Sequence, residues 1–204
     1  RRRNVEIILG SGMPAPSPHV VGAILDTNPD FLWIDTEHNP FGAEALDYIP
    51  VLVRMRGCAP MIRVAWNDPG LIKKAYDVGA VAVMVPQVDT AAEAAQAVQY
   101  ARYAPEGQRG ISPMWTRVAG ADWNEVIKTA NEETVLIVQL ESQQAYDNLD
   151  EIKEVPGIDV ILVGPLDLSA TVGTITDTRS ERVQKIMEDV PRRLVGTGIT
   201  VGTT

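Results

Sequence analysis

The hydrophobic residues of this chain fall in short continuous runs, and longer segments with helical spacing lie between them. The runs predict strands at residues 7–9, 31–34, 61–64, 81–85, 134–140, 160–163 and 199–201. The intervening spacing predicts helices at 19–25, 43–55, 69–77, 90–103, 144–155 and 181–194. Continuous rather than alternating apolar runs are typical of strands covered on both faces, and strands separated by helices indicate a parallel sheet.

Seven strands alternating with helices are one short of a (β/α)₈ TIM barrel, a fold of about 250 residues. The 204-residue chain ends inside the seventh strand, so the last strand and the closing helices are expected to be missing from it. The rival is an open doubly wound sheet, which would want a glycine-rich phosphate loop that the sequence lacks. We therefore expect one barrel domain over residues 1–204, with a functional loop at 104–120.

Net charge, hydropathy and cysteine content exclude several classes of partner and cellular location. The formal net charge of −9 disfavours nucleic acid, and no apolar run approaches the ~20 residues of a membrane helix. Cys58 is the only cysteine, which excludes an internal disulfide and suits a reducing compartment. The basic start, Arg1 to Arg3, precedes only a three-residue apolar run, so no signal peptide is expected. The expected location is the cytoplasm.

Polar residues follow or interrupt the predicted strands, where the active site of a parallel barrel lies. The polar ones are Asp35, Glu37, His38, Arg63, Gln87, Gln139, Glu141 and Asp167, and they stand beside Pro86 and the run Gly164, Pro165 and Leu166. Taken singly, each could be a cap or a turn former. Arg63 and Gln139, however, lie within apolar strands, where a charge or an amide is costly without a partner. The set as a whole points to a functional cavity.

Glu141 and Asp167 are the candidate metal ligands. They end neighbouring parallel strands, so both carboxylates could hold one ion. Oxygen ligands suit Mg²⁺ or Mn²⁺, with water and substrate completing the shell. The alternative is that Glu141 caps a helix and Asp167 forms a cap beside Ser169.

His38 is the candidate general base, with Asp35 or Asp77 orienting its ring. The alternative for His38 is an ordinary surface histidine. Arg63 would pair with a substrate carboxylate or a developing enolate oxygen. Its alternative is a buried ion pair with Asp35 or Glu37.

Two further features bear on the chemistry. The backbone of Gly164, Pro165 and Leu166 could direct N–H groups at an anion, although Pro165 has none to give. A Schiff-base aldolase needs a lysine facing the cavity. The five lysines all fall in predicted helices and none ends a strand, which leaves the metal-dependent route.

Several motifs occur together in the order of a known family. They are Phe31-Leu32-Trp33-Ile34-Asp35-Thr36-Glu37-His38, Arg63-Val64-Ala65-Trp66-Asn67-Asp68-Pro69, Val85-Pro86-Gln87-Val88, Arg109-Gly110, Val138-Gln139-Leu140-Glu141 and Val163-Gly164-Pro165-Leu166-Asp167-Leu168-Ser169. Through these motifs, over nearly its whole length, the chain resembles the HpcH/HpaI aldolases, the metal-dependent pyruvate aldolases.

The resemblance implies a (β/α)₈ barrel that assembles as a homohexamer and binds Mg²⁺ through Glu141 and Asp167. Pyruvate or oxaloacetate would bind the metal, with Gln139 and the backbone of Gly164 to Leu166 helping to hold it. Arg63 would stabilise the enolate. His38, with Asp35 and Asp77, would handle protons.

A narrower resemblance joins the chain to a fungal branch of the family. It rests on Gly10-Ser11-Gly12, Thr36-Glu37-His38-Asn39-Pro40-Phe41 and Ile111-Ser112-Pro113-Met114-Trp115-Thr116-Arg117-Val118-Ala119-Gly120. It implies decarboxylation of oxaloacetate and addition of the enolate to a 2-pyrone, where other members add it to an aldehyde. Two alternatives remain open: a non-catalytic barrel that binds a dicarboxylate or serves as an oligomer scaffold, and a coenzyme-A-ester lyase of the citrate-lyase β type.

Overall fold

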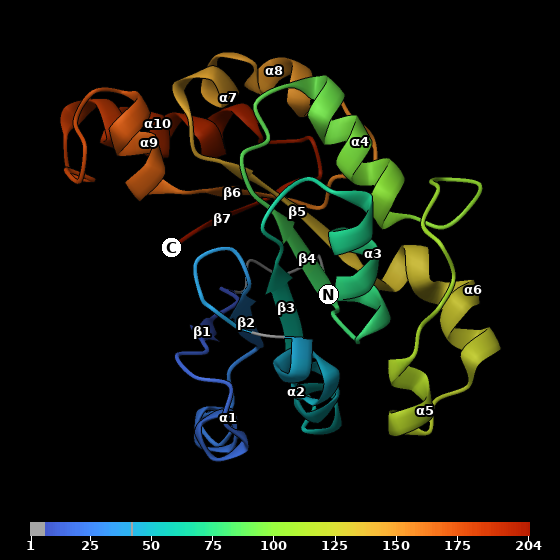
Figure 1. The fold of residues 1–204 in the computed structure, drawn as a ribbon. Coiled ribbons are helices and arrows are strands. Elements are labelled where there is room, and N and C mark those ends of the chain that lie inside the picture. Colours follow the sequence, from blue (N-terminus) through green and yellow to red (C-terminus); the bar gives the residue numbers. More distant parts are fainter. Residues whose placement is uncertain (1–6, 42) are drawn as a thin grey trace.

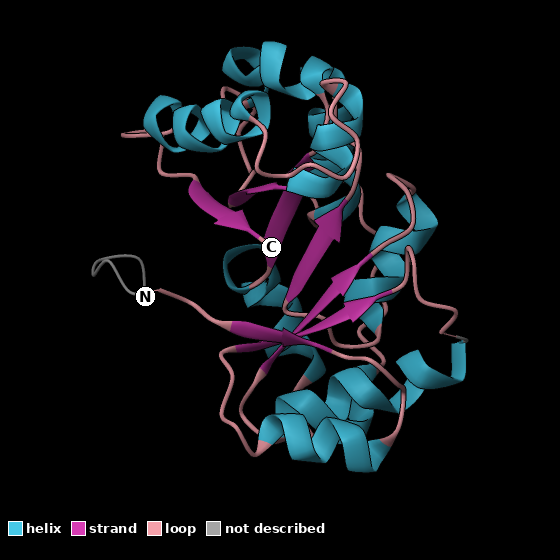
Figure 2. Cartoon of the chain, turned by 90° about the vertical axis from the view of Figure 1, so that its left-hand side faces the viewer, coloured by secondary structure: helices cyan, strands magenta, loops and turns pink. Residues whose placement is uncertain are grey.

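A computed structural model describes residues 7–41 and 43–204, so the basic run Arg1 to Arg3 lies outside it. The described residues form a curled, seven-stranded sheet in which every neighbouring pair is parallel and the strands follow in sequence order (Figures 1 and 2). The strands are β1 (Gly10–Gly12), β2 (Phe31–Asp35), β3 (Ala59–Arg63), β4 (Ala82–Val85), β5 (Val135–Leu140), β6 (Val160–Val163) and β7 (Thr200–Thr203). This is an α/β fold with the shape of a partial barrel.

Helices return the chain from the carboxyl edge of the sheet to its amino edge. They are α1 (Pro18–Leu25), α2 (Ala43–Met55), α3 (Pro69–Asp77), α4 (Ala91–Ala101), α5 (Trp115–Ala119), α6 (Trp123–Glu133), α7 (Gln143–Asp147), α8 (Leu149–Ile152), α9 (Pro165–Thr171) and α10 (Glu181–Arg193). The start of α3 follows its sequence signal, because Asp68 accepts hydrogen bonds from the Gly70 and Leu71 N–H groups ahead of a proline at the first turn.

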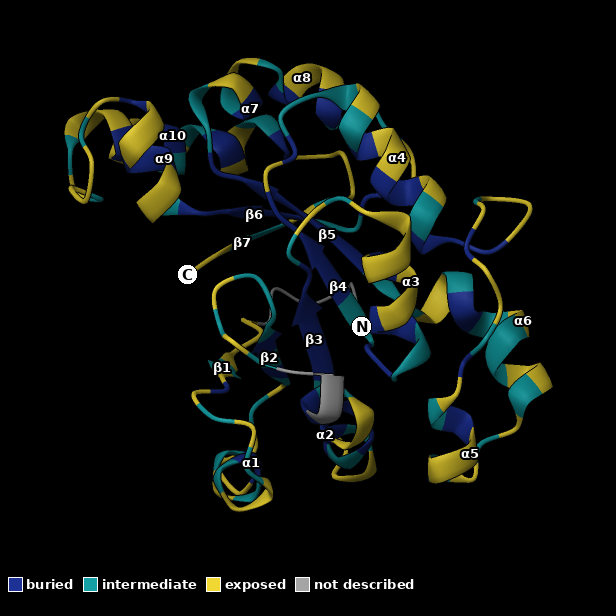
Figure 3. Ribbon diagram, viewed as in Figure 1, coloured by how far each residue is buried: buried dark blue, intermediate teal, exposed yellow. Residues whose placement is uncertain are grey.

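Strand alternation sorts side chains to the two faces of the sheet. In β2, Leu32 and Ile34 are buried beneath the helices, whereas Phe31 and Trp33 pack on the opposite face. That inner face carries a second apolar cluster, Met61, Met84, Ile137 and Leu162. Figure 3 shows the central strands as buried. Toward the carboxyl edge, the last side chains that the alternation places on the inner face are polar rather than apolar. The sheet therefore presents charged side chains at that edge.

The first strand differs from its prediction. Ile7, Ile8 and Leu9 are 81%, 64% and 68% exposed, and β1 is the Gly10–Gly12 segment that follows them. The glycines pair with Phe31–Trp33. A side chain at Gly10 would collide with the Phe31 ring, so only glycine lets this strand come so close.

Three helices were missed by the predictions. The segment 104–120 contains the five-residue α5, and α6 follows it, capped by Asp122, which accepts from the Asn124 and Glu125 N–H groups. The predicted helix at 144–155 is instead two short helices, α7 and α8, and α9 directly follows β6. Helices of four to seven residues are too short to show a clear apolar period.

The other strands and helices lie within a few residues of their predicted ranges, and α2 and β6 coincide with them. The parallel α/β architecture is therefore confirmed. The eighth strand and the extent of the domain over residues 1–204 stay predictions. In the part of the chain that the structure describes, no helix is long and apolar enough to cross a membrane.

Candidate functional site at the carboxyl edge of the sheet

Asp35 and Arg63 stand opposite one another at the carboxyl ends of β2 and β3. Their side chains form a forked ion pair, with Arg63 Nε donating to Asp35 Oδ1 at 2.9 Å and Nη2 to Oδ2 at 2.7 Å. Burial alone would raise the pKa of Asp35, but the hydrogen bonds from Arg63 and from the backbone of Glu37 and His38 hold it below its ordinary value. Asp35 is therefore an ionised carboxylate whose hydrogen bonds hold the Arg63 guanidinium in place.

Arg63 is 7% exposed and contacts a second carboxylate. Its Nη1 lies 3.0 Å from Glu37 Oε2, and its guanidinium lies over the Trp33 ring, 5.0 Å from the centroid. Burial would lower the pKa of Arg63, yet Asp35, Glu37 and Glu141 raise it. The buried ion pair expected as an alternative thus exists, with both expected partners. A guanidinium has five N–H groups, so donors remain on its terminal nitrogens for a ligand.

His38 meets Glu37 rather than the expected partners. Its Nε2 lies 3.7 Å from Glu37 Oε2; the imidazole is 64% exposed and the Glu37 side chain 11%. Asp35 receives the backbone N–H of His38 but does not contact the ring in the described structure. The prediction that Asp35 orients the imidazole is corrected accordingly, because the Asp35 carboxylate is turned onto Arg63 and the backbone.

Glu141 follows β5 and is 4% exposed. Its Oε1 accepts a hydrogen bond from the backbone N–H of Gln87 at 2.8 Å, and Gln87 holds a left-handed φ of 52° to give it. Burial, with help from Asp167 and Glu37, raises the pKa of Glu141 to about 7 against the lowering by the Gln87 hydrogen bond. Ser142, not Glu141, caps the next helix, which removes the capping alternative.

Gln139 and Gly164 border this carboxylate. The Gln139 side chain is 3% exposed, and its Oε1 has no hydrogen-bond partner among the described residues. A Cβ at Gly164 would come 2.8 Å from Gln139 Nε2 and 3.0 Å from Glu141 Oε2, so glycine keeps the space beside both groups open. A buried acceptor without a donor is costly unless a ligand or water supplies one.

Asp167 lies in the first turn of α9, where it is exposed. No side chain or backbone group of the described residues donates a hydrogen bond to it, and Ser169 instead bonds Leu166 O and the Thr176 N–H. The negative charge of Asp167 contributes to raising the pKa of Glu141 and of Glu37. The alternative in which Asp167 forms a cap beside Ser169 is therefore not what the structure contains.

The donor set fits a hard divalent cation. Three carboxylates gather near the Arg63 guanidinium: those of Asp35, Glu37 and Glu141. A fourth, that of Asp167, is close enough to Glu37 and Glu141 to raise the pKa of both. Over the residues that are described, no group of three or more Asp, Glu, His or Cys is arranged to enclose an ion. An ion here would be held by two carboxylates and complete its shell with water and substrate, a mode that Mg²⁺ accepts.

Asp77 does not join this cluster within one chain. It ends α3, which runs back from the carboxyl edge to the amino edge. Its neighbours are Arg109, Lys73 and the backbone of Ser112, and burial raises its pKa to about 6. The expected contact between Asp77 and His38 is thus absent from the described chain, because the direction of the helix carries Asp77 away.

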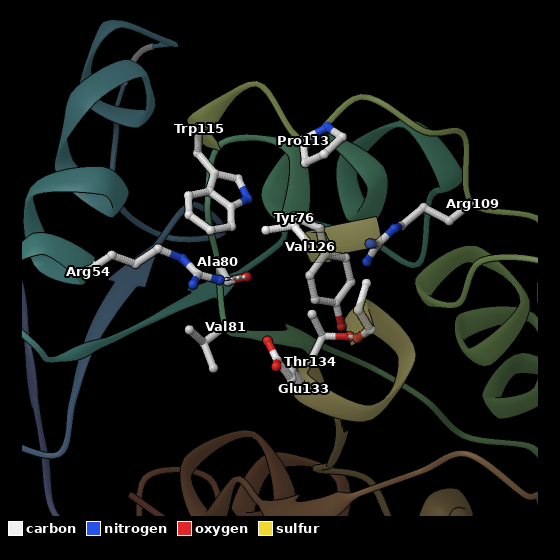
Figure 4. Close-up of a pocket in the computed structure, with 11 residues that line it drawn as sticks. Arg54, Tyr76, Ala80, Val81, Arg109, Pro113, Trp115, Val126, Glu133 and Thr134 are labelled. Atoms are coloured by element: carbon white, nitrogen blue, oxygen red, sulfur yellow. Dashed lines mark hydrogen bonds between the residues drawn. The ribbon is translucent and has the colours of Figure 1, made fainter. Parts of the chain in front are cut away.

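A cavity lies on the amino-edge side, near α3, α5 and α6. It encloses about 150 Å³ and is lined by Arg54, Tyr76, Arg109, Trp115 and Glu133, among others (Figure 4). Arg54 stacks on Trp115 at 4.0 Å and donates to the carbonyls of Gly79 and Ala80. Residues of the 104–120 segment therefore line this cavity, well apart in the fold from the carboxyl-edge cluster.

The chain is similar to proteins of one family. A family model described as HpcH/HpaI aldolase/citrate lyase matches residues 13–201. The 2-keto-3-deoxy-L-rhamnonate aldolase of Escherichia coli (strain K12) is 35% identical over 99% of this chain and 76% of that protein. The 2-dehydro-3,6-dideoxy-6-sulfogluconate aldolase of Pseudomonas putida is 34% identical over 95% of this chain and 76% of its own length.

The fold has matching neighbours among solved structures. A family protein from Burkholderia cenocepacia J2315 superposes with a TM-score of 0.90 at 31% identity, covering 99% of this chain and 81% of that one. Macrophomate synthase, the fungal enzyme to which the narrower resemblance points, superposes with a TM-score of 0.81 at 25% identity, covering 95% and 70%. It is a structural neighbour, while the curated relatives at higher identity are aldolases of keto-deoxy acids.

Proposed function

The chain belongs to the HpcH/HpaI aldolase/citrate lyase family, and from that membership we propose that it is a metal-dependent carbon–carbon lyase acting on a 2-keto acid. One observation carries the proposal: the buried Glu141 feels the charges of both Asp167 and Arg63 and lies next to Gln139, whose oxygen has no partner among the described residues, at the edge of the sheet where parallel barrels have their active sites. Excess negative charge, a fixed cation and a free acceptor together suit a chelated keto acid.

Glu141 and Asp167 would hold Mg²⁺, and Mn²⁺ suits the same oxygen ligands. The ion would act as a Lewis acid on the keto group of the substrate. Glu141 is preset for this role, since the Gln87 N–H fixes one oxygen and Gly164 leaves room beside the other.

Arg63 would stabilise negative charge that develops on the keto oxygen when the substrate becomes an enolate. Asp35 and Glu37 hold the guanidinium in place before substrate arrives, which is the preorganisation that makes such a charge effective. Gln139 would bind the substrate through its amide. Gly164, Pro165 and the 59% exposed Leu166 would border it at the start of α9.

His38 would carry the proton of the acceptor. In aldol cleavage the hydroxyl group loses its proton to a base as the carbon–carbon bond breaks, and the bonding pair becomes the enolate of pyruvate. The exposed imidazole at the rim of the cluster is placed for that exchange. A covalent Schiff-base route is disfavoured, because the lysines lie in helices or at a helix end and not at strand ends. Lys73 and Lys74 lie in α3, Lys128 in α6, Lys185 in α10 and Lys153 at the end of α8.

The relatives direct the choice of substrate. Because the curated proteins at 34–35% identity are aldolases of 2-keto-3-deoxy acids by name, we propose that this chain cleaves such an acid to pyruvate and an aldehyde. Decarboxylation of oxaloacetate passes through the same enolate and would be a second activity, with the 2-pyrone acceptor of macrophomate synthase as its special case. A hexameric assembly and a cytoplasmic location stay predictions.

The direct test is pyruvate release. Purified protein with Mg²⁺ should release pyruvate from 2-keto-3-deoxy-L-rhamnonate and from oxaloacetate faster than Mg²⁺ alone, and EDTA should stop it reversibly. Borohydride added with pyruvate should leave every lysine unmodified. Release that persists in excess EDTA, or a pyruvyl-lysine adduct in the mass spectrum, would overturn the proposal.

A further inference from the structure

Two arginines line the cavity on the amino-edge side, and neither has a carboxylate partner. Arg109 is 8% exposed and Arg54 is half-buried. Arg63 and Arg102 each form an ion pair with an acidic side chain, whereas Arg54 and Arg109 form none with any residue that the structure describes. The fold therefore places two positive charges beside one cavity without placing a carboxylate in contact with either.

The Arg54 guanidinium is held along one edge and one face. Its Nε donates to the Gly79 carbonyl at 2.5 Å, its Nη2 lies 3.4 Å from the Ala80 carbonyl oxygen, and its face stacks on the Trp115 ring. Its Nη1 donates to no group among the described residues. Burial lowers the pKa of Arg54 to about 10, and the charge of Glu133 opposes this only in part. An anion at Nη1 would supply the missing negative charge.

Arg109 is fixed in a similar way. Its guanidinium lies between two aromatic rings, 4.6 Å from the Tyr76 centroid and 3.7 Å from the Tyr103 centroid. Nη1 donates to the Ala101 carbonyl, but Nε is buried and has no hydrogen-bond partner in the described part of the chain. The rings fix the plane of the guanidinium, and a buried donor is costly unless a ligand or water accepts from it.

The shape and charge of the cavity define what it could hold. Figure 4 shows the two arginines entering from opposite sides, with Tyr76 between them. Two arginines against the exposed Glu133 leave the lining residues with a net charge of +1. The volume of about 150 Å³ is roughly ten times what one water needs, yet below the ~300 Å³ at which sites for drug-sized ligands begin. The cavity suits a small anion.

We infer that this cavity is a second ligand site, which takes a small oxyanion such as inorganic phosphate or a short carboxylate. Arg54 would donate to it through Nη1 and Arg109 through Nε, since hydrogen bonds between a guanidinium and a charged oxygen are among the strongest in proteins. The site needs no divalent ion. It lies at the opposite edge of the sheet from Glu141 and Asp167, so the inference does not rest on the proposed lyase activity.

Indole N–H signals can report the two edges separately. Of the four tryptophans, Trp115 stacks on Arg54 and Trp33 lies under Arg63. Protein labelled with ¹⁵N and kept in EDTA is titrated with sodium phosphate and, in a separate series, with sodium pyruvate. Sodium chloride at equal ionic strength is the blank. The loss of one signal in Trp115→Phe, and of another in Trp33→Phe, assigns the two reporters.

Phosphate, pyruvate or both should move the Trp115 signal along a saturating curve and leave the Trp33 signal in place. A response to one anion alone would identify its head group as the preferred ligand. Arg54→Met should weaken the binding by about tenfold or more, the scale of one charge-assisted hydrogen bond. Arg117→Met is the matched control, because Arg117 is an exposed arginine of α5 outside the cavity lining, and it should keep the wild-type affinity.

Three results would overturn the inference. The first is a Trp115 signal that changes with neither anion beyond the chloride blank, and the second is a saturating response confined to Trp33. Both come from the wild-type chain, so they hold even if Arg54→Met fails to fold. The third is equal affinity in folded Arg54→Met and in wild type. Because EDTA removes divalent ions throughout, failure of the lyase proposal would leave the result standing, and the reverse is also true.

Discussion

The two edges of the sheet both bury arginines, and they use them differently. Near the amino edge, Arg102 is 3% exposed and donates to Asp159, to Thr134 and to the carbonyls of Asn131 and Gly157. At the carboxyl edge, Arg63 faces Asp35 and Glu37, with Glu141 close enough to raise its pKa further. Arg102 donates mainly to backbone carbonyls, whereas Arg63 donates to carboxylates and has N–H groups left over for a ligand.

The comparison shows that a buried charge does not by itself mark a functional site. Arg102 satisfies carbonyls where loops meet strands, which is a structural task. The carboxyl edge is set apart by its grouped carboxylates, because Glu37 and Glu141 lie near Arg63 and both feel the charge of the exposed Asp167. Two buried acceptors in the same group, Gln139 Oε1 and Glu37 Oε2, have no hydrogen-bond partner among the described residues. Such acceptors cost stability unless a ligand supplies a cation or a donor.

The largest effect is expected from removing a carboxylate at the carboxyl edge. Glu141→Gln or Asp167→Asn each deletes one charged oxygen ligand, so metal-dependent turnover should be abolished while the far-ultraviolet circular dichroism and melting temperature stay near wild type. Glu188→Gln, a change at an exposed carboxylate paired with Arg192, should keep full activity as the control. Wild-type turnover in either ligand variant would contradict the assignment of the metal site.

Removing Arg102 should give the opposite outcome. Arg102→Ala takes away one side of a buried ion pair and several hydrogen bonds, which typically costs about 3–5 kcal/mol. Denaturant titration should show the loss of unfolding free energy, whereas kcat per folded molecule should stay at the wild-type level. A large fall in kcat at full folding would mean that the amino edge takes part in catalysis.

Arg63 and His38 separate two steps at the carboxyl edge. Decarboxylation of oxaloacetate needs charge stabilisation but no proton removal, so Arg63→Ala should slow it by about 10²-fold, the scale of one preorganised donor. His38→Ala should harm that step less and impair aldol cleavage more. The two rates are compared on the same preparations. Equal damage to decarboxylation by both substitutions would refute this division of roles.

The smallest expected effect concerns Asp77 and pH. Burial raises the pKa of Asp77 to about 6 from 3.8, so the folded state binds this proton more tightly than the unfolded state. Its contribution to stability is greatest below pH 4 and falls as the pH rises to about 6. Asp77→Asn should remove that fall, so the variant gains on wild type between pH 4 and pH 7 in denaturant titrations. A gap between the two proteins that does not change with pH would argue against it.

The fold was largely predictable because apolar runs report burial on both faces. In a βα alternation, the apolar runs at 81–85 and 160–163 can only be strands. The structure has β4 and β6 at these places. The predictions failed where periodicity is weak: α5 and α9 are short, and the apolar run at 7–9 is exposed among the residues that the structure describes.

The candidate site was predictable in outline. Strand alternation places Asp35 and Arg63 together, and their pairing was expected as one alternative. Glu37 was weighed only as a partner of Arg63, although it lies two residues beyond Asp35 and so continues the same inner face. Which carboxylate the imidazole meets depends on how the side chains turn, and sequence does not report that. The error on Asp77 has a simpler cause, since a helix that leaves the carboxyl edge must end at the other one.

We propose that the carboxyl edge turns a keto acid into its enolate with the help of a divalent ion. Exchange of the pyruvate methyl hydrogens in D₂O, followed by proton NMR, measures that step without any knowledge of the acceptor. Exchange should require both the protein and Mg²⁺, disappear in EDTA and be lost in Glu141→Gln. Exchange that continues unchanged in EDTA or in Glu141→Gln would contradict it.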